Sequence, residues 1–136
     1  MPVGYSGKPL VEKLGIKQGQ KVALLSAPGY YESLLTRMPP GVTVARELKG
    51  ELDFVQLFVR DELSLERQLK MSISKIKEDG MIWVSWPKGG SKSKATLGES
   101  KVRSIGLRSG LVDVKICAVD ETWSALKFVK RVKDRR

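Results

Sequence analysis

The sequence contains no histidine, one cysteine and few aromatic residues (7%), and these shortages exclude several kinds of site. Without histidine there is no Ser-His-Asp triad, no imidazole general base and no imidazole ligand for a metal. The single cysteine, Cys117, has no partner for an internal disulfide, and a zinc site is not expected from one thiol without histidine. Because Cys117 lies within the apolar run VDVKICAV, we expect it to be a buried structural thiol.

Long apolar segments are also lacking. No run approaches the roughly 18 residues needed for a membrane-spanning helix, and the start MPVGYSGKPL has no apolar core of a secretory signal. We therefore expect a cytoplasmic protein that makes no contact with a membrane. The length of 136 residues and the 41% hydrophobic content predict one domain over residues 1–136, with an irregular arm at 1–7 and a basic tail at 131–136.

Positive charge is the main excess in the composition. The chain has 25 lysines and arginines against 15 acidic residues, a formal net charge of +10. Such a balance favours contact with an anionic small molecule or a polyanion, although part of the excess lies in the terminal run KFVKRVKDRR. No helix-turn-helix, RNA-recognition or zinc-finger signature is present, so base-specific recognition is not expected.

Apolar periodicity predicts the secondary structure. Continuous apolar runs bounded by turn residues indicate buried strands, and apolar residues three or four positions apart indicate helices. Helices are expected over residues 8–14, 30–38, 62–79 and 97–109, and strands over 20–27, 42–47, 52–59, 81–86, 111–119 and 123–131. Gly80 is the expected C-terminal glycine of the third of these helices.

The order of these elements predicts an α/β fold with three layers. Buried strands that alternate with amphipathic helices form a mainly parallel sheet covered on both faces, here of about six strands. The short turn at Asp120 and Glu121 requires the last two strands to form an antiparallel hairpin. Few residues separate the second strand from the third, so the second strand is either very short and parallel, which we favour, or antiparallel.

Several sequence words carry a resemblance to known proteins. The words GYSGKPLVEKLGI, VALLSAP, LFV, WVSWPK and GLVDVKICAVDETWSALKFV resemble a family of small bacterial proteins catalogued as a domain of unknown function. The order of elements resembles a trimmed version of the Rossmann-like fold of S-adenosylmethionine-dependent methyltransferases. The resemblance implies a compact α/β domain and brings no assigned reaction.

The methyltransferase resemblance implies two cofactor-binding positions that can be compared with this chain. In that class the loop after the first strand is rich in glycine, and an acidic residue after the next strand holds the ribose. Here the loop SAPGYYES has only Gly29, placed between Pro28 and Tyr30. Glu47 occupies the acidic position, with a solvated surface glutamate as the alternative interpretation. We therefore expect no cofactor, and S-adenosylmethionine is the alternative.

The carboxyl ends of the parallel strands are where a ligand is expected to bind. Four stretches should share this rim: Ser26–Tyr30, Arg60–Glu62, Trp86–Lys94 and Asp120–Trp123. The fold predicts in particular that Ala27, Trp86 and Asp120 lie in one neighbourhood. With Glu47, the candidate ligand-binding residues are Ser26, Ala27, Pro28, Gly29, Tyr30, Trp86, Lys88, Lys92, Lys94, Asp120 and Trp123.

Two of these stretches have alternative interpretations. In WPKGGSKSKAT, lysines among glycine and serine residues could hold a phosphate, or they could form a solvated connector. The spacing of a Walker phosphate loop is not present. Asp120 and Glu121 could form a carboxylate pair for proton transfer, or they could make the turn between two strands.

The sequence leaves three functions open. The first is a non-catalytic binding or regulatory domain that contacts an anionic ligand or partner at the rim. The second is a divergent methyltransferase-like enzyme, and the third is a nonspecific nucleic-acid binder. The oligomeric state does not follow from the sequence.

Overall fold

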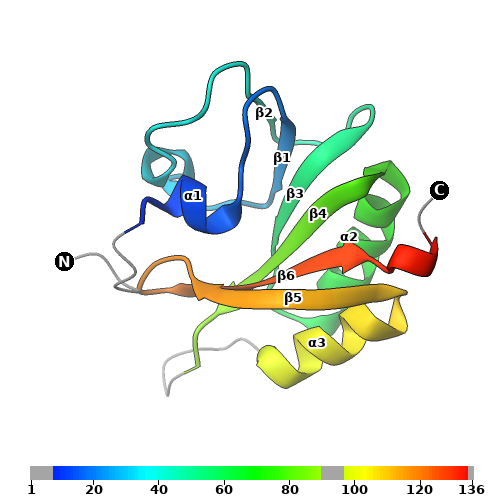
Figure 1. Cartoon of the computed structure of the whole chain (residues 1–136). Helices are drawn as coiled ribbons and strands as arrows, with labels where there is room; N and C mark the ends of the chain where they lie inside the picture. Colours follow the sequence, from blue (N-terminus) through cyan, green and yellow to red (C-terminus); the bar gives the residue numbers. More distant parts are fainter. Residues whose placement is uncertain (1–7, 90–96, 135–136) are drawn as a thin grey trace.

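The molecule is built from a single twisted sheet with helices on both faces (Figure 1). The structure, a computed structural model, describes residues 8–89 and 97–134. The strands are β1 Lys21–Leu25, β2 Thr43–Ala45, β3 Leu52–Phe58, β4 Ile76–Pro87, β5 Leu111–Ala118 and β6 Trp123–Lys130. The helices are α1 Leu10–Leu14, α2 Glu62–Lys75 and α3 Glu99–Arg108, with the 3-10 turns η1 Tyr31–Leu34 and η2 Val132–Asp134.

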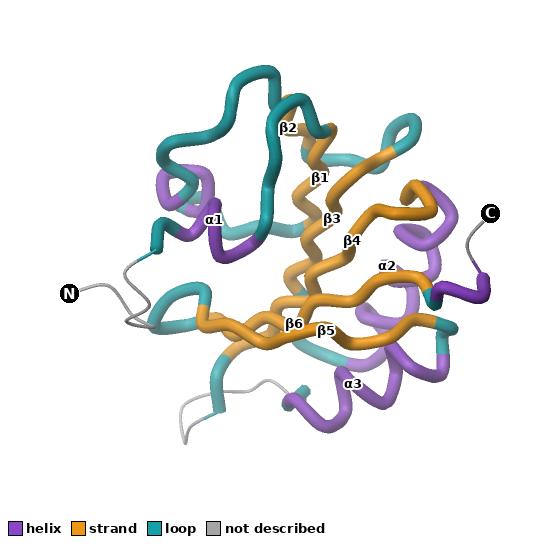
Figure 2. The backbone as a smooth tube through the Cα atoms, in the orientation of Figure 1, coloured by secondary structure: helices purple, strands orange, loops and turns teal. Residues whose placement is uncertain are grey.

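The sheet has the strand order β2-β1-β3-β4-β6-β5 (Figure 2). Strands β2, β1, β3 and β4 are mutually parallel, and β6 is antiparallel to both β4 and β5. This confirms the predicted α/β fold, a mainly parallel sheet of six strands that ends in an antiparallel hairpin. Because β5 points the same way as β4, the carboxyl ends of β1, β3, β4 and β5 lie at one edge of the sheet.

The second strand is short and parallel, as favoured from the sequence. It pairs with β1 only from Lys21↔Thr43 to Ala23↔Ala45. A strand of three residues is the reason that the chain can return to the start of β3 within a few residues.

Apolar side chains on the two faces of the sheet form two cores. One core packs against α2 and α3 and includes Leu65, Leu69 and Ile105, and the other packs against α1 and η1 and includes Leu14 and Tyr31. Except for the short, largely exposed β2, the strands contribute to both cores because successive side chains point to opposite faces. The layering is therefore helix, sheet and helix, the three layers predicted from the sequence.

The prediction of a helix over residues 30–38 was wrong, because only the 3-10 turn η1 forms there. The ring of Tyr31 is fully buried and packs edge-on against Phe58, with 4.7 Å between the ring centroids. Anchoring this side chain in the core fixes the path of the chain after one turn. Leu35 then leaves helical geometry at φ −93°, ψ 61°.

The helix expected over residues 62–79 ends earlier, at Lys75. Ile76, which fits the apolar stripe of the helix, instead begins β4 and pairs with Leu52. The register then shifts, so that Phe54 pairs with Met81 and the chain bulges between these two pairs. A Cβ at Gly80 would lie 2.4 Å from the side chain of Ile76, so this bulge requires glycine and Gly80 does not end the helix.

Other expectations concern the chain ends and the cysteine. Residues 1–7 and the last two residues of the tail lie outside the described residues, whereas residues 132–134 form η2.

Cys117 is only partly buried, on the edge strand β5, and that burial raises the pKa of its thiol. None of the helices within residues 8–89 and 97–134 is both long and apolar enough to cross a membrane.

Candidate functional site

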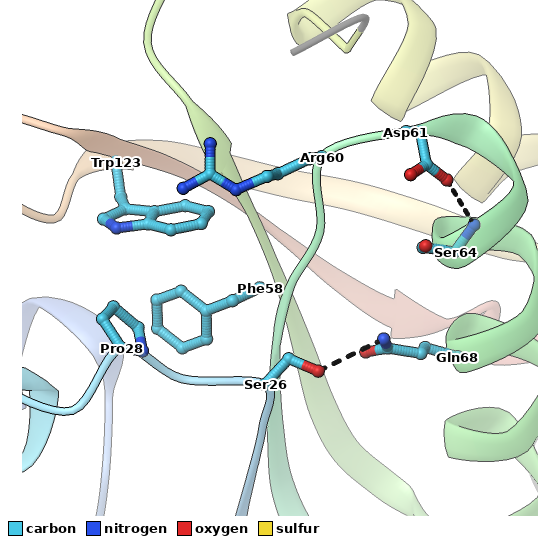
Figure 3. Close-up of a pocket in the computed structure, with 8 residues that line it drawn as sticks. All are labelled: Ser26, Pro28, Phe58, Arg60, Asp61, Ser64, Gln68 and Trp123. Atoms are coloured by element: carbon cyan, nitrogen blue, oxygen red, sulfur yellow. Dashed lines mark hydrogen bonds between the residues drawn. The ribbon is translucent and has the colours of Figure 1, made fainter. Parts of the chain in front are cut away.

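A pocket lies at the point where the chain changes direction across the sheet. From β1 the chain passes to β2 on one side, and it then returns to β3 on the other side of β1. Parallel sheets place ligand sites beyond the carboxyl ends of the strands at such a switch point. The pocket there has a volume of about 360 Å³ and is lined by Ser26, Pro28, Phe58, Arg60, Asp61, Ser64, Gln68 and Trp123 (Figure 3).

One wall of the pocket is aromatic. Phe58, the last residue of β3, meets Trp123, the first residue of β6, edge to face with 5.1 Å between the ring centroids. Both rings are almost fully buried, at 4% and 5% exposure. The guanidinium carbon of Arg60 lies 5.2 Å from the centroid of the Trp123 ring, which places a cation beside an aromatic surface at the pocket (Figure 3).

The opposite wall is polar and belongs to the first turns of α2. Asp61, Ser64 and Gln68 are three and four residues apart, which places them on one side of the helix. The Asp61 carboxylate accepts a hydrogen bond of 2.8 Å from the backbone N–H of Ser64. This bond caps the helix and lowers the pKa of Asp61, so the carboxylate is ionised at neutral pH.

The side-chain amide of Gln68 does not make all the hydrogen bonds that it can form. Its Nε2 donates a long hydrogen bond of 3.4 Å to the hydroxyl of Ser26. Its Oε1 is buried and has no hydrogen-bond partner among the described residues. A buried acceptor without a partner is unfavourable, so a donor on a bound molecule would stabilise this side chain.

Ser26 occupies the turn after β1 with a left-handed backbone, at φ +60°. This region is disfavoured for residues with a Cβ, and such conformations concentrate at functional sites. The conformation turns the chain at the end of β1, and both Ser26 and Pro28 line the pocket.

Tyr30 and Asp120 join two of the predicted stretches at this edge. The Tyr30 hydroxyl donates a 2.8 Å hydrogen bond to Oδ2 of Asp120, and burial together with this carboxylate raises the pKa of Tyr30. The other carboxylate oxygen of Asp120 accepts 2.8 Å bonds from the backbone N–H groups of Thr122 and Trp123. Asp120 therefore makes the turn between β5 and β6, the structural alternative of the two interpretations, while Glu121 is exposed.

Three of the four predicted stretches thus contribute to one pocket. Ser26 and Pro28, Arg60 and Asp61, and Trp123 line it together. The intervening Ala27 packs against the core on the α1 face, and Gly29 is exposed.

Two further candidates, Trp86 and Lys88, do not line the pocket. Trp86 is 4% exposed, packs into the core on the α2 and α3 face and does not line the pocket, although its strand ends beside Trp123. The backbone N–H of Lys88 donates a 2.8 Å bond to the carbonyl of Thr122. Lys92 and Lys94 lie outside the described residues, so the lysine-rich loop stays a prediction.

Glu47 does not line the pocket. It is exposed after β2 and forms an ion pair with Lys49 at 3.4 Å. Its position agrees with the alternative interpretation, a solvated surface glutamate.

The sequence did not single out Phe58, Ser64 or Gln68. Phe58 could have been recognised as the aromatic residue near the end of the apolar run that precedes Arg60. The two polar residues carry no signal in the sequence, because polar positions of an amphipathic helix ordinarily face solvent. Within residues 8–89 and 97–134, no three histidine, cysteine, aspartate or glutamate side chains are grouped to hold a metal ion.

Comparison with known families identifies the chain. Residues 40–132 match the DUF3052 family, whose description is "Protein of unknown function". The chain belongs to this family. The match includes β3, α2 and the β5–β6 hairpin, and therefore most of the residues that line the pocket of this DUF3052 protein. No curated protein matches the sequence.

Solved structures share the fold of this DUF3052 protein at low sequence identity. The pyocyanin biosynthetic protein PhzM is 12% identical with a TM-score of 0.67, over 90% of this chain and 53% of that chain. A SAM-dependent methyltransferase from Aquifex aeolicus is 15% identical with a TM-score of 0.63, over 88% and 86%. Fibrillarin from Aeropyrum pernix, solved with natively bound S-adenosyl-L-methionine, is 11% identical with a TM-score of 0.63, over 93% and 70%.

These likenesses establish the methyltransferase-like scaffold. This chain spans only about half of the length of PhzM. The usual cofactor-holding groups of that scaffold are not matched: Glu47 lies away from the pocket, and Gly29 is the one glycine in the loop after β1. The residues present therefore do not fit S-adenosylmethionine in its usual binding mode.

Proposed function

We propose that this domain is a non-catalytic binding domain that takes a small molecule with a flat or apolar part and an anionic group. The observation that carries the proposal is the position of the Arg60 guanidinium, 5.2 Å from the Trp123 ring centroid, at the switch point of the sheet. The volume of about 360 Å³ is in the range of small-molecule sites, roughly 300–1,000 Å³.

The two walls suggest how such a ligand would be held. Its flat or apolar part would lie against Phe58 and Trp123, and its anionic group would pair with the guanidinium of Arg60. Donors on the ligand would face the ionised Asp61 and Oε1 of Gln68, which has no hydrogen-bond partner among the described residues. This distribution favours a ligand that carries hydroxyl or amino groups as well as negative charge.

Thermal unfolding with a ligand panel tests the proposal. The panel contains AMP, ADP, ATP, NAD⁺, coenzyme A, S-adenosylmethionine and inorganic phosphate. A compound that binds the folded state at 100 times its Kd stabilises the protein by about 2.7 kcal/mol and raises the unfolding midpoint. We expect a shift with at least one compound that combines a ring system and an anionic group, and none with phosphate alone.

Two arginine variants locate the binding. Arg60→Gln should abolish the shift, because it removes the cation at the aromatic wall. Arg108→Gln, which removes an exposed arginine on α3 that pairs with Glu66, should retain it. Equal loss in both variants, or no shift with any panel compound, would contradict the proposal.

A methyltransferase-like enzyme is the second candidate. The strand order and the position of the pocket favour it, together with the fold shared with the Aquifex aeolicus methyltransferase. The loop after β1 is unfavourable, because Pro28 has no backbone donor and bulky Tyr30 follows Gly29. If saturating S-adenosylmethionine leaves the unfolding midpoint unchanged, this candidate is eliminated.

A further inference from the structure

A cluster of four lysines lies on the face of the hairpin that is turned towards α1. Lys115 of β5 and Lys127 of β6 are directly opposite in the register of the two strands. Two positions further along, Cys117 pairs with Ala125, which is buried in the core on the α1 face. Because side chains alternate along a strand, Lys115 and Lys127 point to this same face.

The other two lysines approach from α1. The ammonium group of Lys13 donates a 3.0 Å hydrogen bond to the backbone carbonyl of Ala118, at the end of β5. Lys17 follows α1 and lies close enough to Lys127 to affect its ionisation. We call Lys13, Lys17, Lys115 and Lys127 the hairpin lysine face.

The four ammonium groups of this face have no ion-pair partner in the part of the chain that the structure describes. Burial lowers the pKa of Lys127, and the charges of Lys115 and Lys17 lower it further. Like charges placed directly opposite on two strands are destabilising, so a bound anion would relieve this repulsion.

The composition of the face indicates the kind of anion. Lysine is depleted at protein–protein interfaces, whereas arginine and aromatic residues are enriched there. Lysine binds phosphate as a flexible point charge, and it is a common contact to the backbone of nucleic acids. The net charge of +10 adds a long-range attraction to a polyanion.

We infer that the hairpin lysine face binds the phosphate backbone of a single-stranded nucleic acid without sequence specificity. The face is separate from the pocket, since none of its four lysines lines the pocket. The inference therefore does not depend on the small-molecule proposal.

Fluorescence anisotropy with a labelled 20-nucleotide oligo(dT) tests the inference across 50–200 mM salt. For single strands, the logarithm of the affinity falls with the logarithm of the salt concentration with a slope of about −0.7 per phosphate contact. Four contacts predict a loss of about 50-fold in affinity over this range. The affinity of Lys115→Gln/Lys127→Gln for oligo(dT) should fall only about 7-fold over the same range, because two contacts remain. At 50 mM salt this variant should bind oligo(dT) more weakly than the wild type.

A matched variant controls for net charge. Lys70→Gln/Lys75→Gln removes two exposed lysines from α2, on the opposite face of the sheet, and should retain the wild-type salt slope. Arg131→Gln/Lys133→Gln, next to the terminal segment, should also retain it. Arg60→Gln should bind the oligonucleotide as the wild type does, whatever its effect on small molecules.

Several outcomes would overturn the inference. These are no binding by the wild-type protein at 50 mM salt, or an equal change of slope in either control variant. Tighter binding of labelled polyglutamate than of oligo(dT) would assign the face to an acidic protein instead. If circular dichroism shows that Lys115→Gln/Lys127→Gln does not fold, Lys13→Gln/Lys17→Gln provides the same comparison of slopes.

Discussion

The phenol oxygen of Tyr30 lies 2.8 Å from Oδ2 of Asp120, although the two residues are 90 positions apart in the sequence. Tyr30 belongs to the loop after β1, and Asp120 belongs to the turn between β5 and β6. The hydrogen bond joins these two segments across the carboxyl edge of the sheet. The bond therefore holds together the loop after β1 and the β5–β6 turn, which lie next to the pocket residues Pro28 and Trp123.

The Tyr30–Asp120 bond should give a measurable coupling energy. Tyr30 is 46% exposed, so solvent weakens the contribution of the bond. We expect Tyr30→Phe to lower the free energy of unfolding by about 0.5–1 kcal/mol. Asp120→Ala should lower it by about 2 kcal/mol, because it also removes the acceptor for the N–H groups of Thr122 and Trp123.

A double-mutant cycle measured by urea unfolding separates these contributions. The coupling between the two positions should be about 0.5–1 kcal/mol. Additive effects of the two substitutions would mean that the bond does not join the loops in solution.

A buried chain of hydrogen bonds that links η1, β3 and β4 should be far more sensitive to substitution than the Tyr30–Asp120 bond. The Tyr31 hydroxyl donates to Oε1 of Gln56 at 2.5 Å, and Nε2 of Gln56 donates to the hydroxyl of Ser85 at 2.9 Å. All three side chains are fully buried. Gln56→Ala leaves both hydroxyl groups without this partner and creates a cavity, so we expect a loss of about 3 kcal/mol.

Ser85→Ala is the matched comparison for Gln56→Ala, because it leaves the hydrogen bond between Tyr31 and Gln56 in place. It should lower the free energy of unfolding by about 1 kcal/mol. Chemical denaturation of both variants gives the comparison, and equal losses would contradict the central position of Gln56.

The stability of the protein should fall at high pH because of Tyr31. Burial raises the pKa of Tyr31 in the folded state, whereas in the unfolded chain it ionises near 10.0. The contribution of the neutral phenol is therefore complete below pH 10 and is lost as the pH rises above that value. Urea unfolding at pH 8, 9, 10.5 and 11.5 should show this decline.

Tyr31→Phe isolates this residue from the other groups that titrate above pH 10. The variant should be less stable at pH 8 because it lacks the bond to Gln56, but it should decline less steeply with pH. A decline as steep as that of the wild type would assign the pH dependence to other groups.

Gly106 should not tolerate alanine, although it lies in the interior of α3. A Cβ at this position would lie 2.1 Å from Cε1 of Phe128, a core side chain of β6. Alanine favours helix by about 1 kcal/mol, but the overpacking should outweigh this and give a net loss of about 2 kcal/mol. Gly89→Ala is the control, since none of the described residues has an atom within 4 Å of the added Cβ.

Thermal or urea unfolding of the two glycine variants makes the comparison. The Gly89 variant should differ from the wild type by less than about 0.5 kcal/mol. A stabilised Gly106 variant would mean that α3 lies further from the sheet than this structure places it.

The sheet was predictable because its signals are local. The apolar runs of β1, β3 and β4 identify buried parallel strands, and the short turn at Asp120 and Glu121 requires a hairpin. The position of the carboxyl edge then follows from topology, which explains why Ser26, Pro28 and Trp123 were predicted to lie at one rim.

The errors arose where a distant partner decides the local structure. Leu34 and Leu35 fit a helix, but the burial of Tyr31 against Phe58 holds that segment in a single turn. Ile76 fits both a helix and a strand, and only its pairing with Leu52 decides between them. Gln68 could not have been assigned to the pocket, because sequence does not indicate which polar side of α2 faces Ser26.

The tryptophan indole signals in a ¹H–¹⁵N correlation spectrum test the central claim, ligand binding at the pocket, most directly. The chain has three tryptophans, and only Trp123 lines the pocket, whereas the indole N–H of Trp83 donates to the carbonyl of Leu14 inside the core. Titration with the panel compound that raises the unfolding midpoint most should move the Trp123 signal in the wild type but not in Arg60→Gln. The Trp83 signal should stay in place throughout. An unmoved Trp123 signal at saturation, or equal movement of all three signals, would contradict the account.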